Sequence, residues 1–167
     1  MSHRAEPRAM KRAQFAASLA GLALFSSSVR RSGATETYAV SHSDAQWREL
    51  LGPDRYEILR QGGTEPAFSS PLIKETRSGT YRCAGCDLAL FSSKWKYDSG
   101  DGWPSFWTVL PNATRTQSDY ALIEKRTEVH CGRCGGHLGH IFDDGPAPTH
   151  LRYCIDGLAL RFVPGVA

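Results

Sequence analysis

The sequence predicts a mainly β, antiparallel domain that is held together by a zinc ion and preceded by short N-terminal helices. Three observations support this fold class. Short apolar runs divided by turn residues follow Gly79, two C-x-x-C pairs are separated by 44 residues, and a helix-capping pattern begins at Ser43. With 167 residues, including seven Phe, six Tyr and four Trp, the chain is long enough for one domain with a hydrophobic core.

Residues 1–34 have the pattern of a targeting segment, and we expect residues 35–167 to form the folded domain. Lys11 and Arg12 precede an apolar run at residues 15–25, and small residues that resemble a cleavage site follow it. The run is too short to cross a bilayer, which needs about 20 apolar residues. We therefore expect export to the periplasm or the medium, without stable membrane insertion after processing. Organelle import and a cytoplasmic protein with an uncleaved start are the alternatives.

Much of the positive charge lies in the first 32 residues. The chain has a net charge of +3, but residues 1–32 hold six of its 20 basic and one of its 17 acidic residues, which leaves 14 basic and 16 acidic residues in the remainder. A nearly neutral domain lacks the basic patch that phosphate binding needs. We therefore expect no nucleic-acid partner and, since no oligomerisation signal is evident, a monomer.

The folded region is expected to open with helix. Residues 43–46 (Ser-Asp-Ala-Gln) form a capping box, and Trp47, Leu50 and Leu51 follow on one predicted face. The Gly-Pro pair at residues 52–53 interrupts the pattern before a second short helix, which is predicted to run through Ile58.

Strand signals begin at Gly79. Short apolar runs bounded by turn residues predict strands at residues 80–82, 121–123, 128–130, 151–153 and 158–162. Their shortness and the turn residues between them are typical of antiparallel β structure.

Two cysteine pairs predict a metal centre. Cys83 and Cys86 form one C-x-x-C pair, and Cys131 and Cys134 form the other. Four thiolates satisfy one zinc ion tetrahedrally at about 2.3 Å, so that zinc here would be structural, with no open position for a catalytic water. Two disulfides are the alternative for an exported protein.

Cys154 is the fifth cysteine and has no partner by spacing. A lone thiol beside a histidine-rich stretch is a candidate nucleophile, because a thiolate attacks electrophiles far better than an oxygen group of similar size. A buried structural thiol is the other interpretation.

Four of the six histidines, namely His130, His137, His140 and His150, lie within 21 residues. Each has a structural interpretation as well as a catalytic one. Residues three apart in a strand point to opposite faces, so that His137 and His140 line one pocket only if Gly139 allows a bulge or turn between them.

Three sequence blocks resemble those of the peptide methionine-R-sulfoxide reductases. They are S-G-x-G-W-P-S-F at residues 99–106, C-x-x-C-G-x-H-L-G-H-x-F at residues 131–142 and R-Y-C-I at residues 152–155. The resemblance covers about residues 44–164. It implies a fold of two antiparallel sheets in a tent-like or open-barrel arrangement.

The resemblance also implies a mechanism. The Cys154 thiolate attacks the sulfoxide sulfur of an oxidised methionine, free or in a protein, and Cys154 is left as a sulfenic acid. The oxygen leaves as water, which needs proton donors. By position, His137, His140 and Asp144 correspond to the groups that bind and protonate the sulfoxide oxygen.

The same resemblance implies a substrate pocket. Trp103 corresponds to the apolar wall that receives the terminal methyl group and discriminates the sulfoxide epimers. Phe142, Arg152 and Asp156 are the further residues expected at the substrate. Arg152 lies two residues before the thiol on the same strand face and is expected to lower the pKa of Cys154.

Two positions depart from the commonest family pattern. Asp101 stands where many members have a resolving cysteine, so that with four cysteines on zinc no free thiol remains to form a disulfide with Cys154. We therefore expect direct reduction by thioredoxin, glutaredoxin or a small thiol. Asp156 stands where the family usually carries asparagine, and a negative charge there is expected to raise the pKa of the thiol.

Two other classes of function remain open from the sequence. The first is a binding module held together by zinc, which binds a peptide or small ligand at Trp103 without chemistry. The second is a zinc-ribbon nucleic-acid binder, against which the nearly neutral domain argues.

Overall fold

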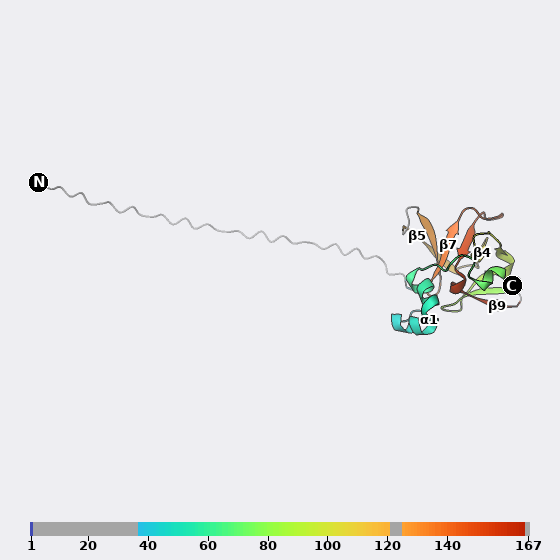
Figure 1. The fold of residues 1–167 in the computed structure, drawn as a ribbon, viewed down its shortest axis with the longest axis horizontal. Coiled ribbons are helices and arrows are strands. Elements are labelled where there is room, and N and C mark those ends of the chain that lie inside the picture. The colour runs from blue at the N-terminus through green and yellow to red at the C-terminus, as the bar shows by residue number, and fades with distance from the viewer. Residues whose placement is uncertain (2–36, 121–124, 166–167) are drawn as a thin grey trace. The chain divides into compact units, whose positions relative to one another are not determined.

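The computed structural model describes Met1, residues 37–120 and residues 125–165, and Figure 1 shows the folded unit that spans Glu36–Ala167. Apart from Met1, the predicted targeting segment lies outside the described residues, as does the predicted strand at residues 121–123.

The described residues form one helix, three 3₁₀ turns and nine strands. The helix is α1 (Asp44–Gln61), and the 3₁₀ turns are η1 (Pro71–Lys74), η2 (Ser93–Trp95) and η3 (Gly157–Ala159). The strands are β1 (Gly79–Cys83), β2 (Ala89–Ser92), β3 (Lys96–Tyr97), β4 (Ser105–Phe106), β5 (Thr114–Asp119), β6 (Arg126–Cys131), β7 (His137–Phe142), β8 (Arg152–Ile155) and β9 (Leu160–Pro164).

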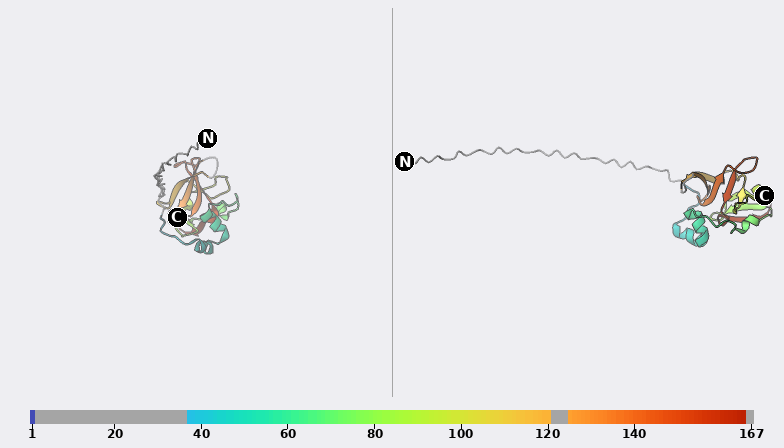
Figure 2. Two further views of the ribbon diagram at one scale, coloured as in Figure 1. Left: turned by 90° about the vertical axis from the view of Figure 1, so that its left-hand side faces the viewer. Right: turned by 45° about the horizontal axis from the view of Figure 1, so that its top comes forward.

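The described strands make two sheets. The smaller has the order β2-β1-β9, the larger has the order β3-β4-β8-β7-β6-β5, and their paired strands are antiparallel. Helix α1 contacts β7 and η3, and Figures 1 and 2 show it beside the strands at one end of the unit. The prediction of a mainly β fold with two antiparallel sheets is therefore confirmed.

Aromatic side chains join the two sheets. Phe91 of β2 stacks on Phe106 of β4 with ring centroids 4.3 Å apart, and Tyr81 of β1 meets the same ring edge-on at 4.9 Å. All three residues are fully buried. Such pairs add about 0.5–1.5 kcal/mol each beyond the burial of their area, so that they fix β4, and with it the neighbouring strand β8, against the smaller sheet.

The N-terminal helix begins as the sequence predicts. The Ser43 side chain accepts the N–H of Gln46 and the Gln46 side chain accepts the N–H of Ser43, which completes the capping box. The chain bends at Gly52, whose φ is 68°, and resumes as helix as far as Gln61, three residues beyond the predicted end at Ile58. Within the described residues, no helix is both long and apolar enough to cross a membrane.

The prediction for Leu50 was wrong, because its side chain is 58% exposed while Trp47 and Leu51 are buried. Residues four apart share a helix face more closely than residues three apart, and here the buried stripe follows the Trp47–Leu51 row.

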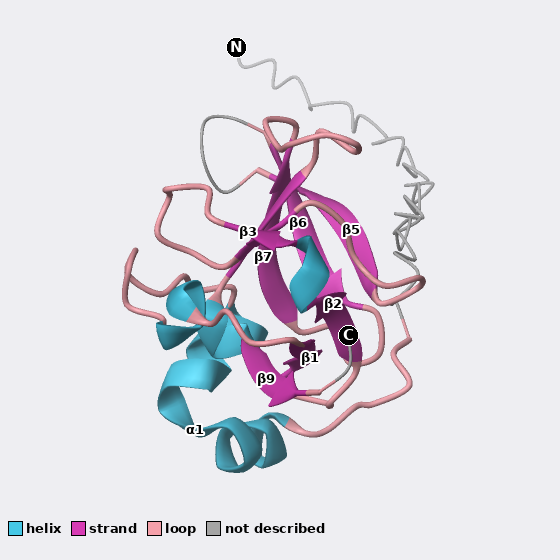
Figure 3. Cartoon of the chain, turned by 90° about the vertical axis from the view of Figure 1, so that its right-hand side faces the viewer, coloured by secondary structure: helices cyan, strands magenta, loops and turns pink. Residues whose placement is uncertain are grey.

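The strand predictions agree with the structure in four places. The runs at residues 80–82 and 128–130 lie within β1 and β6, which Figure 3 labels, and the run at residues 151–153 overlaps β8. The run at residues 158–162 was wrong at its first two residues, because Leu158 and Ala159 belong to the 3₁₀ turn η3. Strands β2, β3, β4, β5 and β7 were not predicted, because their apolar runs are short or are interrupted by polar residues.

A bulge in β7 brings two histidines to one face. His130 of β6 pairs with His137, and the next residue back, Val129, pairs with Gly139, so that Leu138 is an extra residue in β7. Gly139 has a φ of 145°, and a Cβ at this position would lie 2.1 Å from the carbonyl oxygen of Cys154. The bulge places the rings of His137 and His140 5.5 Å apart, which meets the condition that the sequence set for a shared site.

The bulge generates a stability prediction. Gly139→Ala is expected to destabilise the fold by about 3 kcal/mol or more, because the methyl group meets backbone in a conformation that favours glycine. Gly165→Ala is the matched control, since Gly165 has a similar φ of 153° and nothing within 4 Å of the added Cβ. Equal losses in the free energy of unfolding, measured by urea titration, would contradict the steric argument.

Candidate active site and metal centre

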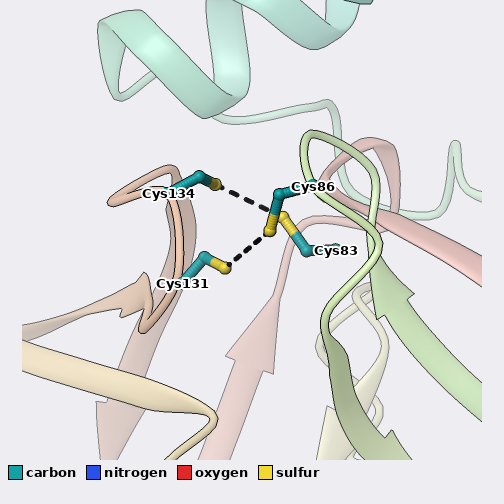
Figure 4. Close-up of side chains that lie close together, drawn as sticks. All are labelled: Cys83, Cys86, Cys131 and Cys134. Carbon is teal, nitrogen blue, oxygen red and sulfur yellow. Dashed lines mark hydrogen bonds between the residues drawn. The ribbon is translucent and has the colours of Figure 1, made fainter. Parts of the chain in front are cut away.

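Four cysteine side chains converge from two hairpin tips. Cys83 and Cys86 come from the end of β1 and the following turn, and Cys131 and Cys134 come from the end of β6 and its turn (Figure 4). The Sγ atoms of Cys83 and Cys134 are 3.7 Å apart, those of Cys86 and Cys131 are 3.4 Å apart, and all four lie within 4.8 Å of one another.

The two tips have the same backbone design. Asp87 donates its N–H to the carbonyl of Cys83, and Gly135 donates to that of Cys131, each at 2.9 Å. Asp87 and Gly135 occupy equivalent positions and both are left-handed, with φ values of 61° and 68°. The two C-x-x-C turns therefore have the same backbone conformation. In the second turn the left-handed residue is glycine, which adopts this conformation without strain.

The donor set fits a soft metal ion. A tetrahedron with metal–sulfur bonds of about 2.3 Å has sulfur–sulfur edges of about 3.8 Å, close to the distances between these cysteines. A disulfide needs about 2.05 Å, and none of the five cysteines, all of which are described, forms one. Four protein thiolates fill a tetrahedral site, so that a metal held here serves the fold rather than catalysis.

The fifth cysteine, Cys154, borders a separate cavity of about 130 Å³. The cavity has an apolar side made by two aromatic rings and a polar side made by a histidine, an arginine and a carboxyl group. Its lining residues are Thr64, Trp103, Arg126, Gly139, His140, Phe142, Cys154 and Asp156.

Strand pairing positions the thiol. Cys154 lies in β8 between β4 and β7, where its Cα partners are Ser105 and His140. Burial raises the pKa of Cys154 to about 11; Asp101 and Asp156 also raise it, while Arg152 lowers it. The predicted directions for Arg152 and Asp156 therefore agree with the structure, but burial has the largest effect. The thiol holds its proton at neutral pH.

Arg152 is bound by two carboxylates. Its Nε and Nη2 donate to the two oxygens of Asp144 at 2.7 and 2.8 Å, and its Nη1 donates to Asp101. The guanidinium also lies over the ring of Phe142, with Cζ 4.4 Å from the ring centroid. The carboxylate of Asp101 thus partly neutralises the positive charge of Arg152, which would otherwise favour a thiolate at Cys154.

The two histidines of β7 are each oriented by a carboxylate. Nδ1 of His137 lies 2.5 Å from Oε1 of Glu128, and Nε2 of His140 lies 2.9 Å from Oδ2 of Asp119. Burial lowers the pKa of His137, although the hydrogen bond that His137 donates to Glu128 opposes this shift. A neutral His137 that donates through Nδ1 presents Nε2 as an acceptor.

Glu65 connects the two sides of the cavity. Its carbonyl accepts the indole N–H of Trp103 at 3.1 Å, and its own N–H donates to Oδ1 of Asp156 at 2.9 Å. Its buried carboxylate accepts the N–H groups of Gly157 and Leu158 at the start of η3. One residue thus orients both the aromatic wall and the carboxyl group beside the thiol.

Comparison with known proteins assigns the family. The SelR domain matches residues 51–164. Peptide methionine sulfoxide reductase MsrB of Leptospira interrogans is 52% identical over 126 residues, which cover 75% of this chain and 96% of that protein. The proteins of the same name from Agrobacterium fabrum and Methanosarcina barkeri are 52% and 48% identical and are covered to 93% and 88%.

The chain belongs to the methionine sulfoxide reductase B family. The resemblance read from the sequence blocks is therefore confirmed. The matched segment contains all four clustered cysteines, Cys154 and the lining of the cavity.

The structure brings together most of the expected site residues of this family member. On the cavity lie Cys154, His140, Trp103, Phe142 and Asp156. His137 borders an adjoining polar cavity of about 370 Å³, which shares Thr64, Arg126 and His140 with the first.

Asp144 lies apart from that cavity. Its side chain is 59% exposed, and the hydrogen bond from Arg152 lowers its pKa. An ionised Asp144 has no proton to give, so the geometry favours a role through Arg152 over the predicted one of protonating the substrate oxygen.

Several residues of the site were not predicted from the sequence. The loop after α1 contributes Thr64 and Glu65, strand β5 contributes Asp119, and strand β6 contributes Arg126 and Glu128. Glu128 lies two residues from His130 in a strand, a weak signal that both face one side. For Glu65 the sequence carries no local signal, because its partners are more than 30 residues away.

The cysteine cluster generates the next prediction. Cys131→Ser is expected to lose the bound metal and several kcal/mol of folding free energy, because the released metal no longer joins the two hairpins. Metal content by elemental mass spectrometry and thermal melting are the measurements. Cys154→Ser is the matched control and is expected to keep both, so full metal occupancy in Cys131→Ser would disprove the assignment.

The Arg152 cluster generates another. Asp101→Asn is expected to lower the pKa of Cys154 and to speed its alkylation by iodoacetamide several-fold near pH 8. The substitution removes a negative charge near the thiol, and the positive charge of Arg152 is then less neutralised by its partners. Asp98→Asn, at an exposed residue in the same loop, is the control. An unchanged pH profile of alkylation would show that Asp101 does not act on the thiol.

Proposed function

We propose that the protein reduces the R epimer of methionine sulfoxide to methionine, in proteins and as the free amino acid. The observation that carries this proposal is the position of Cys154 on a small cavity, between aromatic rings that suit a methyl group and polar groups that suit an oxygen. Membership of the methionine sulfoxide reductase B family supports the same reaction.

The proposed reaction oxidises Cys154. Its sulfur attacks the sulfoxide sulfur, the S–O bond breaks, and the products are methionine and a Cys154 sulfenic acid. The sulfoxide sulfur gains the two electrons that the thiol sulfur loses, and the oxygen atom is transferred overall. Because the pKa of Cys154 is raised to about 11, the thiolate is expected to form together with proton transfer toward the substrate oxygen rather than in advance.

An external thiol is proposed to complete the cycle. Asp101 occupies the position where a resolving cysteine would stand, and the other four cysteines are gathered in the metal cluster. Since no further cysteine exists in the sequence, thioredoxin, glutaredoxin or a small thiol reduces the sulfenic acid directly.

Zinc is the proposed metal of the cluster, in a structural role. A set of four thiolates suits zinc, and four protein ligands leave no coordination position open for a catalytic water. We further propose that residues 1–34 direct export and that the catalytic domain comprises residues 35–167. In an oxidising compartment, such an enzyme depends on a dedicated electron donor.

The test is methionine release from separated R and S epimers of methionine sulfoxide, free and in a peptide, with excess dithiothreitol. We expect turnover of the R epimer alone and its complete loss in Cys154→Ser. A single turnover without reductant is expected to add one oxygen atom to Cys154, detected by mass spectrometry after trapping.

Two results would count against the proposal in different ways. A Cys154-containing intramolecular disulfide after one turnover would refute direct regeneration while leaving the reductase activity intact. Absence of turnover by folded, metal-loaded protein would instead favour a binding module, for which the raised pKa of Cys154 and the nearby Asp101 and Asp156 are the supporting features.

A further inference from the structure

Asp156 is a buried carboxyl group on the wall of the cavity that holds Cys154. Its side chain is 4% exposed, and the residue follows β8 directly. Oδ1 accepts the N–H of Glu65 at 2.9 Å, while Oδ2 lies 3.7 Å from Nε2 of His137, too far for a hydrogen bond. The two oxygens therefore have different environments, since one has a firm donor and the other has none at hydrogen-bond distance among the described residues.

The groups around Asp156 disfavour a negative charge there. Glu65 is buried beside it and takes the two backbone N–H donors at the start of η3 for its own carboxylate. From β7, His137 gives its Nδ1 to Glu128. A second buried anion next to Glu65 would lack a paired cation, which is costly in a dry site.

The remaining charged groups on the cavity have other partners. His140 and Arg126 both contact the carboxylate of Asp119, and Cys154 in β8 is itself a group that would become negative. Burial raises the pKa of Asp156 to about 7; the hydrogen bond from the Glu65 N–H opposes this shift, and the charge of the Glu65 carboxylate adds to it. The carboxyl group is therefore about half protonated near pH 7 and mostly neutral at lower pH.

We propose that Asp156, in its protonated form, is a catalytic acid that donates a hydrogen bond and then a proton to the departing sulfoxide oxygen. This inference rests on the proposed reductase function and adds to it the source of a proton. A neutral carboxyl group keeps Oδ1 as the acceptor for Glu65 and gains one O–H donor at Oδ2. It thus offers the acceptor and the donor that an asparagine would offer in the same space, and in addition a transferable proton.

The proton balance of the step is complete. As the bond between the Cys154 sulfur and the methionine sulfur forms and the S–O bond breaks, the oxygen takes one proton from the thiol and one from Asp156 and leaves as water. Water then attacks the Cys154 sulfur, the S–S electron pair goes to methionine, and one proton returns to Asp156. The products are methionine, a sulfenic acid at Cys154 and Asp156 in its protonated form.

Ionisation of Asp156 then has two effects of the same sign. It removes the donor from the oxygen, and it places a negative charge near Cys154 that raises the pKa of the thiol. Both effects slow the reaction as the pH rises through the pKa of Asp156.

The experiment measures single-turnover rate constants, with enzyme in excess over an R-sulfoxide peptide so that no reductant enters, from about pH 5.5 to about 9. The wild-type rate is expected to fall above about pH 7, up to about tenfold per pH unit for loss of one proton. Asp156→Asn is expected to lack this fall, being slower than wild type in acid and faster in alkali. Glu65→Gln is expected to move the fall to lower pH, because a neighbouring negative charge is removed.

Alkylation of Cys154 by iodoacetamide gives a readout without turnover. In the wild type, its rise with pH is expected to flatten near pH 7 as Asp156 ionises, and Asp156→Asn is expected to rise without this inflection. A wild-type enzyme that is active but has no fall near neutrality, or a fall that persists in Asp156→Asn, would overturn the inference and leave the reductase function standing. Wild-type protein without turnover at any pH would instead overturn the proposed function, and the acid role with it.

Discussion

The convergence of four cysteine sulfurs is the constraint on which the rest of the structure depends. It joins the β1–β2 hairpin of the smaller sheet to the β6–β7 hairpin of the larger one, at tips with the same backbone turn. Strand β7 begins three residues after Cys134, so the position of the clustered cysteines fixes where the strand enters the sheet. The bulge at Leu138 follows at once and turns the two histidines to a common side. The cysteine cluster and the candidate active site are therefore linked by a few residues of one strand.

The candidate site surrounds a partly buried thiol with several carboxyl groups and few cations. Arg152 is bound by Asp101 and Asp144, and Arg126 is bound by Asp119, so that the positive charges near Cys154 are already paired. Burial then keeps the proton on the thiol. In the proposed reaction, the thiol therefore gives up its proton only when a substrate oxygen that can accept it enters the cavity. This agrees with a reaction in which protons and electrons move to the substrate together.

The sequence predicted what depends on local pattern or fixed spacing. The capping box at Ser43, the cysteine pairs and the requirement for a bulge at Gly139 were all visible from neighbouring residues, and family motifs supplied the candidate roles of Cys154, His140 and Trp103. What failed depends on tertiary contact. Leu50 faces solvent because the kink at Gly52 and the packing of α1 select another stripe, and Glu65 takes its importance from partners at residues 103 and 156–158. No local pattern marks such long-range carboxyl contacts.

Glu65 uses its carbonyl oxygen for Trp103, its N–H for Asp156 and its carboxylate for the turn that follows Asp156. The indole and the carboxyl group are thus both tied to the backbone of one residue, and their separation follows from covalent geometry more than from the packing of separate elements. The distance between these two walls sets the width of the cavity. For the proposed substrate, walls held at a fixed separation would favour a methyl group over a longer alkyl chain through the width of the cavity rather than through the strength of any single contact.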